Sequence, residues 1–471
     1  MHNGSQLTAH PALSTPAGVT HDLLDKHRST GGMFRGAVVV FSLLLGLGVV
    51  GFVLRLQDGV SNTAIWGYHA AVFAFILTTA QGAPLVAIAP RLAKAHWRRP
   101  ISRSAELFSV VGLFNLLLFI PLLWVLPSLE DGRRSLWFFD ALDTKYADVP
   151  VYSPHIWATL AIVFLVMTGV ALLWVSSLPD LAAVRDSSTG SKQRMFARMA
   201  FGWSGTSRQW HMLYNRLGIL GAFYFMMLVF VHFLVSVDFA MALIPGWIDA
   251  LFPATHAFHS LQAGVATVLL TMFFLRQFGG YKEYIGLDQF WSLGKLLFSL
   301  SLLWFWFWFS SFNVLWYGKR PIERDALQLL MFGPYQAIFI ATFMLNFIVP
   351  LFAMIWNPVR KSIWGPTIIA VGVLIGTLLD RIRIYVAAYS VPGIGDSSVD
   401  KHEMHEIPTT VLPGLPDVLI WVGAISGSIL VYMLASRVFP VVNIWEQKEL
   451  LLYKFHKPFH RTEVMVLGKP D

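Results

Sequence analysis

Cysteine is missing from all 471 residues of the sequence. The chain can therefore form no disulfide, thiolate metal site, cysteine-bound iron–sulfur cluster or covalently attached c-type haem. Any redox centre that it serves belongs to a partner or is a bound ligand. The composition predicts no metal site on the chain itself.

Charged residues are also scarce, at 13% of the sequence, whereas hydrophobic residues make up 56% and the mean hydropathy is +0.60. Such a chain is too apolar for a soluble multi-domain protein. We predict an all-α, polytopic membrane protein, because each helical crossing of a bilayer core roughly 30 Å thick takes about 20 mostly apolar residues. The net charge of +8 does not indicate nucleic-acid binding, since the basic residues lie in short loops between apolar runs.

Ten apolar runs predict ten spans, at about 33–56, 64–90, 104–127, 154–178, 214–239, 256–278, 290–317, 334–356, 364–390 and 415–439. They divide the chain into a polar arm (1–32), a membrane domain (33–440) and an amphipathic, basic tail (441–471) that lies on the membrane or on a partner. In the second span, Gly82 and Pro84 interrupt the helix and offer a small-residue face for close helix contact.

The orientation follows from the short loops, because an excess of Lys and Arg marks the cytoplasmic side of a membrane protein. The two ends of the chain and the loops on their side carry 22 Lys and Arg residues, and the opposite loops carry seven. Both termini are therefore predicted to be cytoplasmic. Asp238 then lies at the outer end of the fifth span.

Several short motifs resemble the NrfD/PsrC family, the membrane subunits of polysulfide reductase. They extend over about residues 60 to 392, and the ordered run from Gly202 to Pro253 is the most specific part. The motifs are Pro179-Asp180-Leu181-Ala182-Ala183-Val184-Arg185-Asp186, Gly202-Trp203-Ser204-Gly205-Thr206-Ser207-Arg208-Gln209-Trp210, Asp238-Phe239-Ala240, Pro245-Gly246-Trp247, Phe252-Pro253, Trp316-Tyr317, Gly333-Pro334-Tyr335 and Asp380-Arg381.

With ten predicted spans, the chain looks most like the large branch of this family found in alternative complex III. The resemblance implies two four-helix bundles, made by spans two to five and six to nine, and a quinol site near the outer face. It also implies an iron–sulfur subunit, cytochrome c subunits and a second NrfD-like membrane subunit as partners, in the bacterial inner (cytoplasmic) membrane. Protons are expected to move through the bundles.

The sequence departs from the family pattern where a quinol site needs proton acceptors. The usual histidine after the third span falls near Leu123 or Trp124, and the acid expected after Trp157 is an alanine. The usual glutamate of span seven falls on Ser311, and the histidine expected after Trp247 is Ile248. These losses favour a paralogue that keeps the scaffold with a degenerate quinol site.

Five titratable residues remain in the outer leaflet, where burial in a membrane is costly enough to indicate function by default. They are Asp238, His69, His232, His256 and His259. The functional interpretation is a substitute quinol pocket or a proton exit around Asp238. The structural alternative is that Asp238 hydrogen-bonds backbone at the Pro245–Trp247 turn and that the histidines satisfy helix ends.

The second costly cluster is Asp380, Arg381 and Arg383 on the ninth span. Its structural interpretation is an ion pair that locks the bundle. The alternative is one station of a proton path together with Lys295, although Lys295 is close enough to its helix start to snorkel to the surface. The aromatic run at 304–309 surrounds its helix with bulky groups, as a lipid-facing or subunit-facing span can.

Haem is not expected, although His69 and His232 are deep enough to be considered as ligands, because the repeated histidine spacing of dihaem cytochromes is absent. A non-covalently bound quinone is the ligand that the resemblance implies. Three functions stay open: an accessory membrane subunit of a quinol-oxidising complex, the quinol-oxidising and proton-conducting subunit itself with a relocated site at Asp238, and a secondary transporter. Whether the chain itself is an enzyme is left open.

Overall fold

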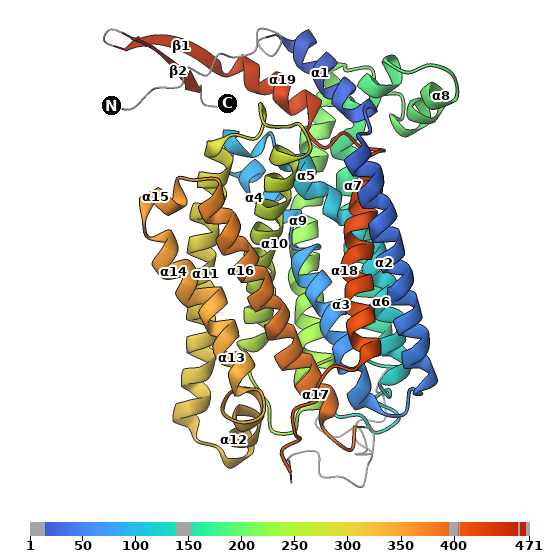
Figure 1. The fold of residues 1–471 in the computed structure, drawn as a ribbon, viewed down its shortest axis with the longest axis vertical. Helices are drawn as coiled ribbons and strands as arrows, with labels where there is room; N and C mark the ends of the chain where they lie inside the picture. Colours follow the sequence, from blue (N-terminus) through green and yellow to red (C-terminus); the bar gives the residue numbers. More distant parts are fainter. Residues whose placement is uncertain (1–14, 138–151, 395–403, 405, 460–461, 468–471) are drawn as a thin grey trace.

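The computed structural model describes residues 15–137, 152–394, 404, 406–459 and 462–467. The first part of the predicted arm (1–14) and the last residues of the predicted tail (468–471) lie outside the described residues. Long helices run side by side to form the body, with short helices and a small hairpin at one end (Figure 1). Apart from this hairpin, the described chain has the all-helical membrane fold predicted from the sequence.

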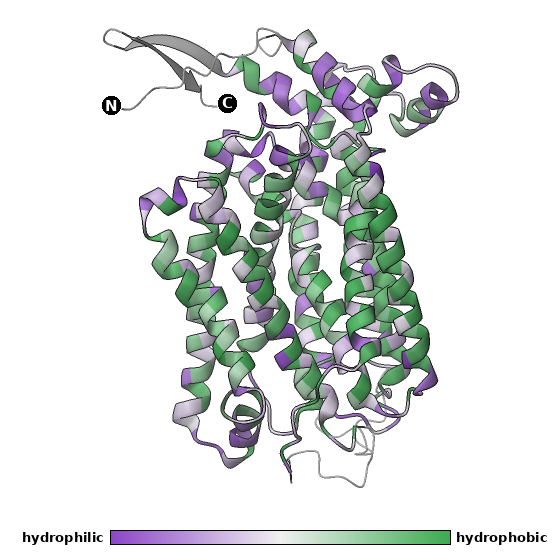
Figure 2. Ribbon diagram, viewed as in Figure 1, coloured by the Kyte–Doolittle hydropathy of each residue, from purple (hydrophilic) through white to green (hydrophobic). Residues whose placement is uncertain are grey.

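Eight helical segments among the described residues are long and apolar enough to cross a bilayer. The predicted second and ninth spans are helical but fall outside that set. The second is interrupted at Gly82–Pro84, and the ninth carries Asp380 and two arginines near its end. Apolar residues dominate the long helices in Figure 2, whereas hydrophilic residues gather at both ends of the body. This distribution suits helices surrounded by lipid at mid-height.

The first bundle consists of the predicted spans two to five. Helix α7 packs along α9, α6 contacts α3 and α7, and α4 contacts α9. A capping box starts α9, in which Thr206 and Gln209 satisfy backbone N–H groups of the first turn. The helices are α3 (Gly67–Thr79), α4 (Leu85–Leu92), α5 (Ser102–Glu106), η4 (Leu107–Val110), α6 (Val111–Val125), α7 (His155–Asp186) and α9 (Ser207–Asp238).

The second bundle consists of the predicted spans six to nine. Helix α10 packs against α11 and α16, and the eighth span fills the space between α11 and α16. The eighth and ninth spans each contain a π-helical turn, a feature often found at functional sites. The helices are α10 (Phe252–Gln277), α11 (Leu287–Gly318), α13 (Gln336–Phe343), η8 (Met344–Ile348), α14 (Val349–Met354), α16 (Trp364–Arg381), η9 (Ile382–Val386) and α17 (Ala387–Ser390).

Glycines bring the two bundles together where the second span is interrupted. A Cβ atom added to Gly82 would lie 2.3 Å from the carbonyl oxygen of Ser260 on α10, and one added to Gly264 would lie 2.5 Å from the backbone of Gly82. No side chain fits in this contact, so the backbones of the two bundles touch. The small-residue face predicted at Gly82 therefore forms the contact between the bundles.

A separate helix pair, α2 (Gly32–Gln57) and α18 (Leu415–Ala435), packs against the first bundle through α3 and α6. The pair meets at Gly48 and Gly423, where a Cβ atom added to Gly48 would lie 2.4 Å from the Cα atom of Gly423. Short helices connect the spans: η2 (Thr63–Trp66), η3 (His96–Arg98), η6 (Met241–Leu243), α12 (Pro321–Leu327), η7 (Gln328–Phe332) and α15 (Asn357–Arg360).

The end of the body that carries the chain's terminal segments is capped by α1 (Pro16–Arg28), α8 (Gly190–Met199) and α19 (Ile444–Leu452) (Figure 1). Helix α1 packs on α19. After α19 the chain forms an antiparallel hairpin of β1 (Lys454–Phe459) and β2 (Thr462–Leu467). The predicted tail thus contains a helix that docks on the body and a hairpin that projects from it.

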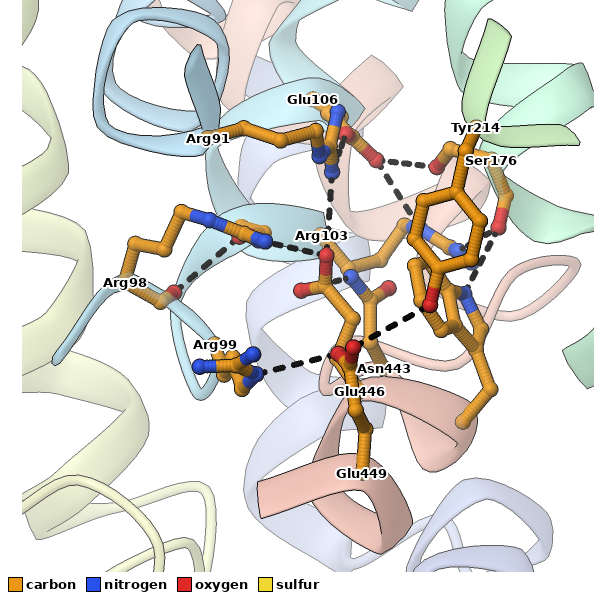
Figure 3. A network of polar contacts seen from close by, with 12 residues as sticks. Arg91, Arg98, Arg99, Arg103, Glu106, Ser176, Tyr214, Asn443, Glu446 and Glu449 are labelled. Carbon is orange, nitrogen blue, oxygen red and sulfur yellow. Dashed lines mark hydrogen bonds and ion pairs between the residues drawn. The ribbon is translucent and has the colours of Figure 1, made fainter. Parts of the chain in front are cut away.

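A buried ionic network holds α19 against the first bundle (Figure 3). Arg98 and Arg91 contact the Glu446 carboxylate at 2.5 and 3.3 Å, and Arg91 also contacts Glu106 at 2.6 Å. Arg103 extends the network to Glu106 at 3.3 Å and to Asp180 at 3.1 Å. Arg99 contacts Glu449 at 3.1 Å, and the amide of Asn443 donates to Glu446 at 2.8 Å. Opposite charges compensate one another here, as buried charges must.

Burial alone would raise the pKa of Glu446, but the guanidinium groups of Arg98 and Arg91 outweigh it and hold the pKa to about 2. A carboxyl whose pKa is lower in the folded state than in the unfolded chain stabilises the fold fully above its unfolded pKa. That contribution is lost as the pH falls from about 4.5 towards 2. The docked tail is therefore expected to stay in place at mildly acidic pH.

The variant Glu446→Gln is expected to lower the free energy of unfolding by about 3–5 kcal/mol at neutral pH, because it leaves buried arginines without a counter-charge. Thermal unfolding of the purified protein between pH 7 and 2 measures this loss. The melting temperature of the wild type should fall between pH 4.5 and 2 more steeply than that of the variant. The exposed Glu283→Gln serves as control, and equal melting curves for both variants would contradict the prediction.

Candidate functional site

Two of the predicted residues, His232 and His256, meet at the interface between the two bundles, together with Tyr385, which was not predicted. His232 of α9 lies with its Nδ1 atom 2.8 Å from Nδ1 of His256 on α10, and Nε2 of His256 lies 3.1 Å from the hydroxyl of Tyr385 on η9. All three side chains are fully buried. A hydrogen bond between two histidine nitrogens requires one to donate and the other to accept. The proton between them can therefore reside on either ring.

One helical turn along α10, His259 faces the predicted cluster of the ninth span. Its Nδ1 atom lies 3.3 Å from the Asp380 carboxylate and 3.2 Å from the guanidinium of Arg381, while Nε2 lies 3.1 Å from the Thr377 hydroxyl. One ring nitrogen cannot donate to Asp380 and accept from Arg381 at the same time. The proton on His259 therefore decides which of these two partners it binds.

Asp380 is the counter-charge for two buried arginines. Arg383, one turn further along the helix, donates to Oδ1 at 2.7 Å, and Arg381 lies 3.5 Å from Oδ2. Arg381 also donates to the Thr78 hydroxyl of α3 at 3.1 Å, and so joins the ninth span to the first bundle. The predicted ion pair is present, and it lies in one cluster with His259.

A pocket that is partly open to the outside borders this cluster. It lies in the second bundle between α10, α11, the α12–η7 segment and η9. Five predicted residues line it: His256, His259, Asp380, Arg381 and Arg383. Three tryptophans, Trp247, Trp304 and Trp308, form part of its wall. These five predicted residues thus gather at a cavity in the second bundle.

Asp249 lines the same pocket, although it is not among the predicted site residues. Its carboxylate accepts hydrogen bonds from the Ser311 hydroxyl and from the backbone N–H groups of Leu251 and Phe252. Burial raises the pKa of this carboxyl, and these hydrogen bonds partly offset the rise. Its position just before α10 is typical of a helix cap. The available sequence signal therefore predicts a cap, and only the fold places the acid against Ser311.

Asp238 lies apart from this cluster, in the first bundle. Its two carboxylate oxygens accept hydrogen bonds from the indole N–H groups of Trp137 and Trp157, at 2.8 and 3.0 Å. The buried Arg133 is close by and stacks over the ring of Phe239 at 5.1 Å. Asp238 therefore has specific partners, none of which is one of the predicted histidines.

The other two predicted residues also have separate surroundings. His69 binds the carbonyl oxygen of Leu118 through Nε2 at 2.8 Å, so the pair considered for haem, His69 and His232, makes unrelated contacts. Lys295 is exposed, and its ammonium lies 4.3 Å from the ring of Trp291. This placement agrees with a snorkelling lysine and puts no charge from Lys295 into the cluster around Asp380.

The fold and the buried polar cluster define a polytopic membrane protein with ionisable groups between two helical bundles. A family model described as polysulphide reductase, NrfD matches residues 57–393, and the chain belongs to the NrfD family. Membership indicates a membrane subunit of a quinone-linked oxidoreductase complex that pairs with an iron–sulfur subunit. No curated protein matches the chain.

Replacing Asp380 by asparagine removes the counter-charge of two buried guanidinium groups. The Asp380→Asn variant is expected to lose about 3–5 kcal/mol of stability, the usual cost of breaking a buried ion pair from one side. Thermal unfolding in detergent measures this loss, with the exposed Asp288→Asn as matched control. If both variants melt like the wild type, Asp380 does not hold the bundles together.

Proposed function

We propose that the chain is a membrane subunit of a quinol-oxidising complex of the alternative complex III type. In this proposal it anchors an iron–sulfur subunit, cytochrome c subunits and a second NrfD-like subunit, and it moves protons through its second bundle. Family membership supports the class of complex. The observation that carries the proton role is the buried cluster from His232 through His256 and His259 to Asp380.

The chemistry of this cluster suits proton transfer. Oxidation of a quinol releases two protons, which need acceptors within hydrogen-bond reach. The Nδ1 atoms of His232 and His256 lie 2.8 Å apart, close enough to share a proton, and the hydroxyl of Tyr385 on η9 contacts the other nitrogen of His256. Ionisable groups at membrane depth usually serve ion or proton pathways, because their burial has a free-energy cost.

The geometry around Asp238 favours a structural role over a relocated quinol site. Both of its oxygens are bound by indole N–H groups that hold the carboxylate in place, and Asp238 does not line the pocket. A transporter is less well supported, because α10, the counterpart of the interrupted second span, is a continuous helix of 26 residues. We therefore favour the anchoring subunit with a degenerate first-bundle site.

The basic loops further support an orientation with both termini in the cytoplasm of a bacterial inner membrane. The chain has no native cysteine, so single-cysteine variants test this directly. Ser61→Cys, in the exposed turn after α2, should react with a membrane-impermeant maleimide in intact spheroplasts. Ser191→Cys, exposed on α8, should react only after the membrane is opened. The reverse pattern would invert the proposed topology.

The function itself is tested on the complex purified through a tag on this chain. Iron–sulfur and cytochrome c subunits should co-purify, and Asp238→Asn should leave the rate of quinol oxidation within about twofold of the wild type. His256→Gln should lower proton release in proteoliposomes by about a hundredfold, the lower end of the usual range for loss of an acid–base group. A large loss of quinol oxidation in Asp238→Asn would restore the relocated-site alternative, and purification without redox partners would refute the proposal.

A further inference from the structure

We propose that the pocket of the second bundle, between α10, α11 and η9, binds the head group of a quinone or quinol. The proposal rests on the proposed function, because a quinol-oxidising complex supplies this ligand. It assigns the ligand to the second bundle and away from the first-bundle position of Asp238. Only binding is inferred, and electron transfer is left to the redox partners.

Several buried N–H groups on the pocket wall lack a hydrogen-bond acceptor. The indole N–H groups of Trp304 and Trp308 are buried and have no hydrogen-bond partner among the described residues, and the same holds for Nε of Arg383. All three residues line the pocket. Buried donors are nearly always satisfied in native proteins. A ligand with acceptor oxygens would satisfy these donors.

The pocket wall also carries a hydrogen-bond acceptor, the carboxylate of Asp249. The Asp249 carboxylate, which Ser311 contacts, can accept a hydrogen bond from a quinol hydroxyl. The orphan donors can bind the carbonyl oxygens of the oxidised ring. A quinone carries an oxygen at each end of a flat ring, so one oxygen can hydrogen-bond to the donors while the other lies against the acid. Donors and an acceptor on one wall match both redox states.

The pocket wall is mainly aromatic and aliphatic, as in most small-molecule sites, with Phe252, Leu315 and Leu330 besides the tryptophans. An anionic lipid head group is disfavoured, because the carboxylates of Asp380 and Asp249 oppose the two positive charges of Arg381 and Arg383 on the same wall. A neutral ring with an apolar tail is the better match.

A photoreactive azido-quinone with a decyl tail tests the proposal on the purified complex. Illumination should attach the probe to peptides from residues 247–259, 304–315 or 326–331, and excess unlabelled decyl-quinone should suppress the labelling. Each of Trp304→Phe and Trp308→Phe removes one N–H donor and keeps an aromatic ring. Each is expected to raise the Kd of the probe by about threefold to tenfold, the usual net effect of one hydrogen bond.

The aromatic run at 304–309, which contains both pocket tryptophans, also supplies a matched control. Trp306 lies between the two pocket tryptophans in sequence but is 63% exposed, so Trp306→Phe should leave the Kd unchanged. Asp249→Asn should weaken binding of the reduced probe more than that of the oxidised probe. Gel filtration tests whether each variant complex remains assembled. If one tryptophan variant dissociates, the other tryptophan variant is used in its place.

Three outcomes would overturn the proposal. The first is that adducts form only around Asp238. The second is that the Kd of the probe is the same as in the wild type for both Trp304→Phe and Trp308→Phe. The third is that excess phospholipid suppresses the labelling whereas excess decyl-quinone does not. A complex that oxidises quinol without labelling here would refute this site and leave the proposed function intact. Labelling of the pocket in a chain purified without redox partners would keep the site and refute the proposed function.

Discussion

The balance of charge around Asp380 is the interaction on which the interior of this protein depends. Two guanidinium groups lie buried beside one carboxylate, so removal of that carboxylate would leave buried charges without a partner. Arg381 also contacts Thr78 on α3, and His259 on α10 contacts Asp380. The cluster therefore joins three helices from both bundles.

The two bundles have similar architecture but different polar interiors. In the first, Asp238 is bound by two indoles, and its environment is that of a structural acid. In the second, an open pocket borders the histidines and the ion pair. The family resemblance predicts an acid on span seven where this chain has Ser311, and the fold brings the carboxylate of Asp249 to that side chain.

Much of the fold was predictable because membrane helices have a simple physical signature. Long apolar runs predicted the helices, and Gly82 with Pro84 predicted the interruption of the second span, where the bundles touch. The pair of Asp380 and Arg383 was also readable, since residues three apart share a helix face. Asp249 was missed, because its sequence position is that of an ordinary helix cap. Whether His232 shares a site with His256 was likewise unreadable, because the two residues lie on different spans.

The sequence by itself determined the class of protein, its helices and the local ion pair, because hydropathy and helical spacing act over short distances along the chain. Only the tertiary structure decided that His232, His256 and Tyr385 meet, that Asp238 belongs to a separate site, and that Trp304 and Trp306 face opposite environments. These contacts depend on the rotation of each helix about its own axis and on the angles at which packed helices cross. Such contacts arise from packing between distant segments, as with His256 and Tyr385, which are 129 residues apart, and no local pattern encodes them.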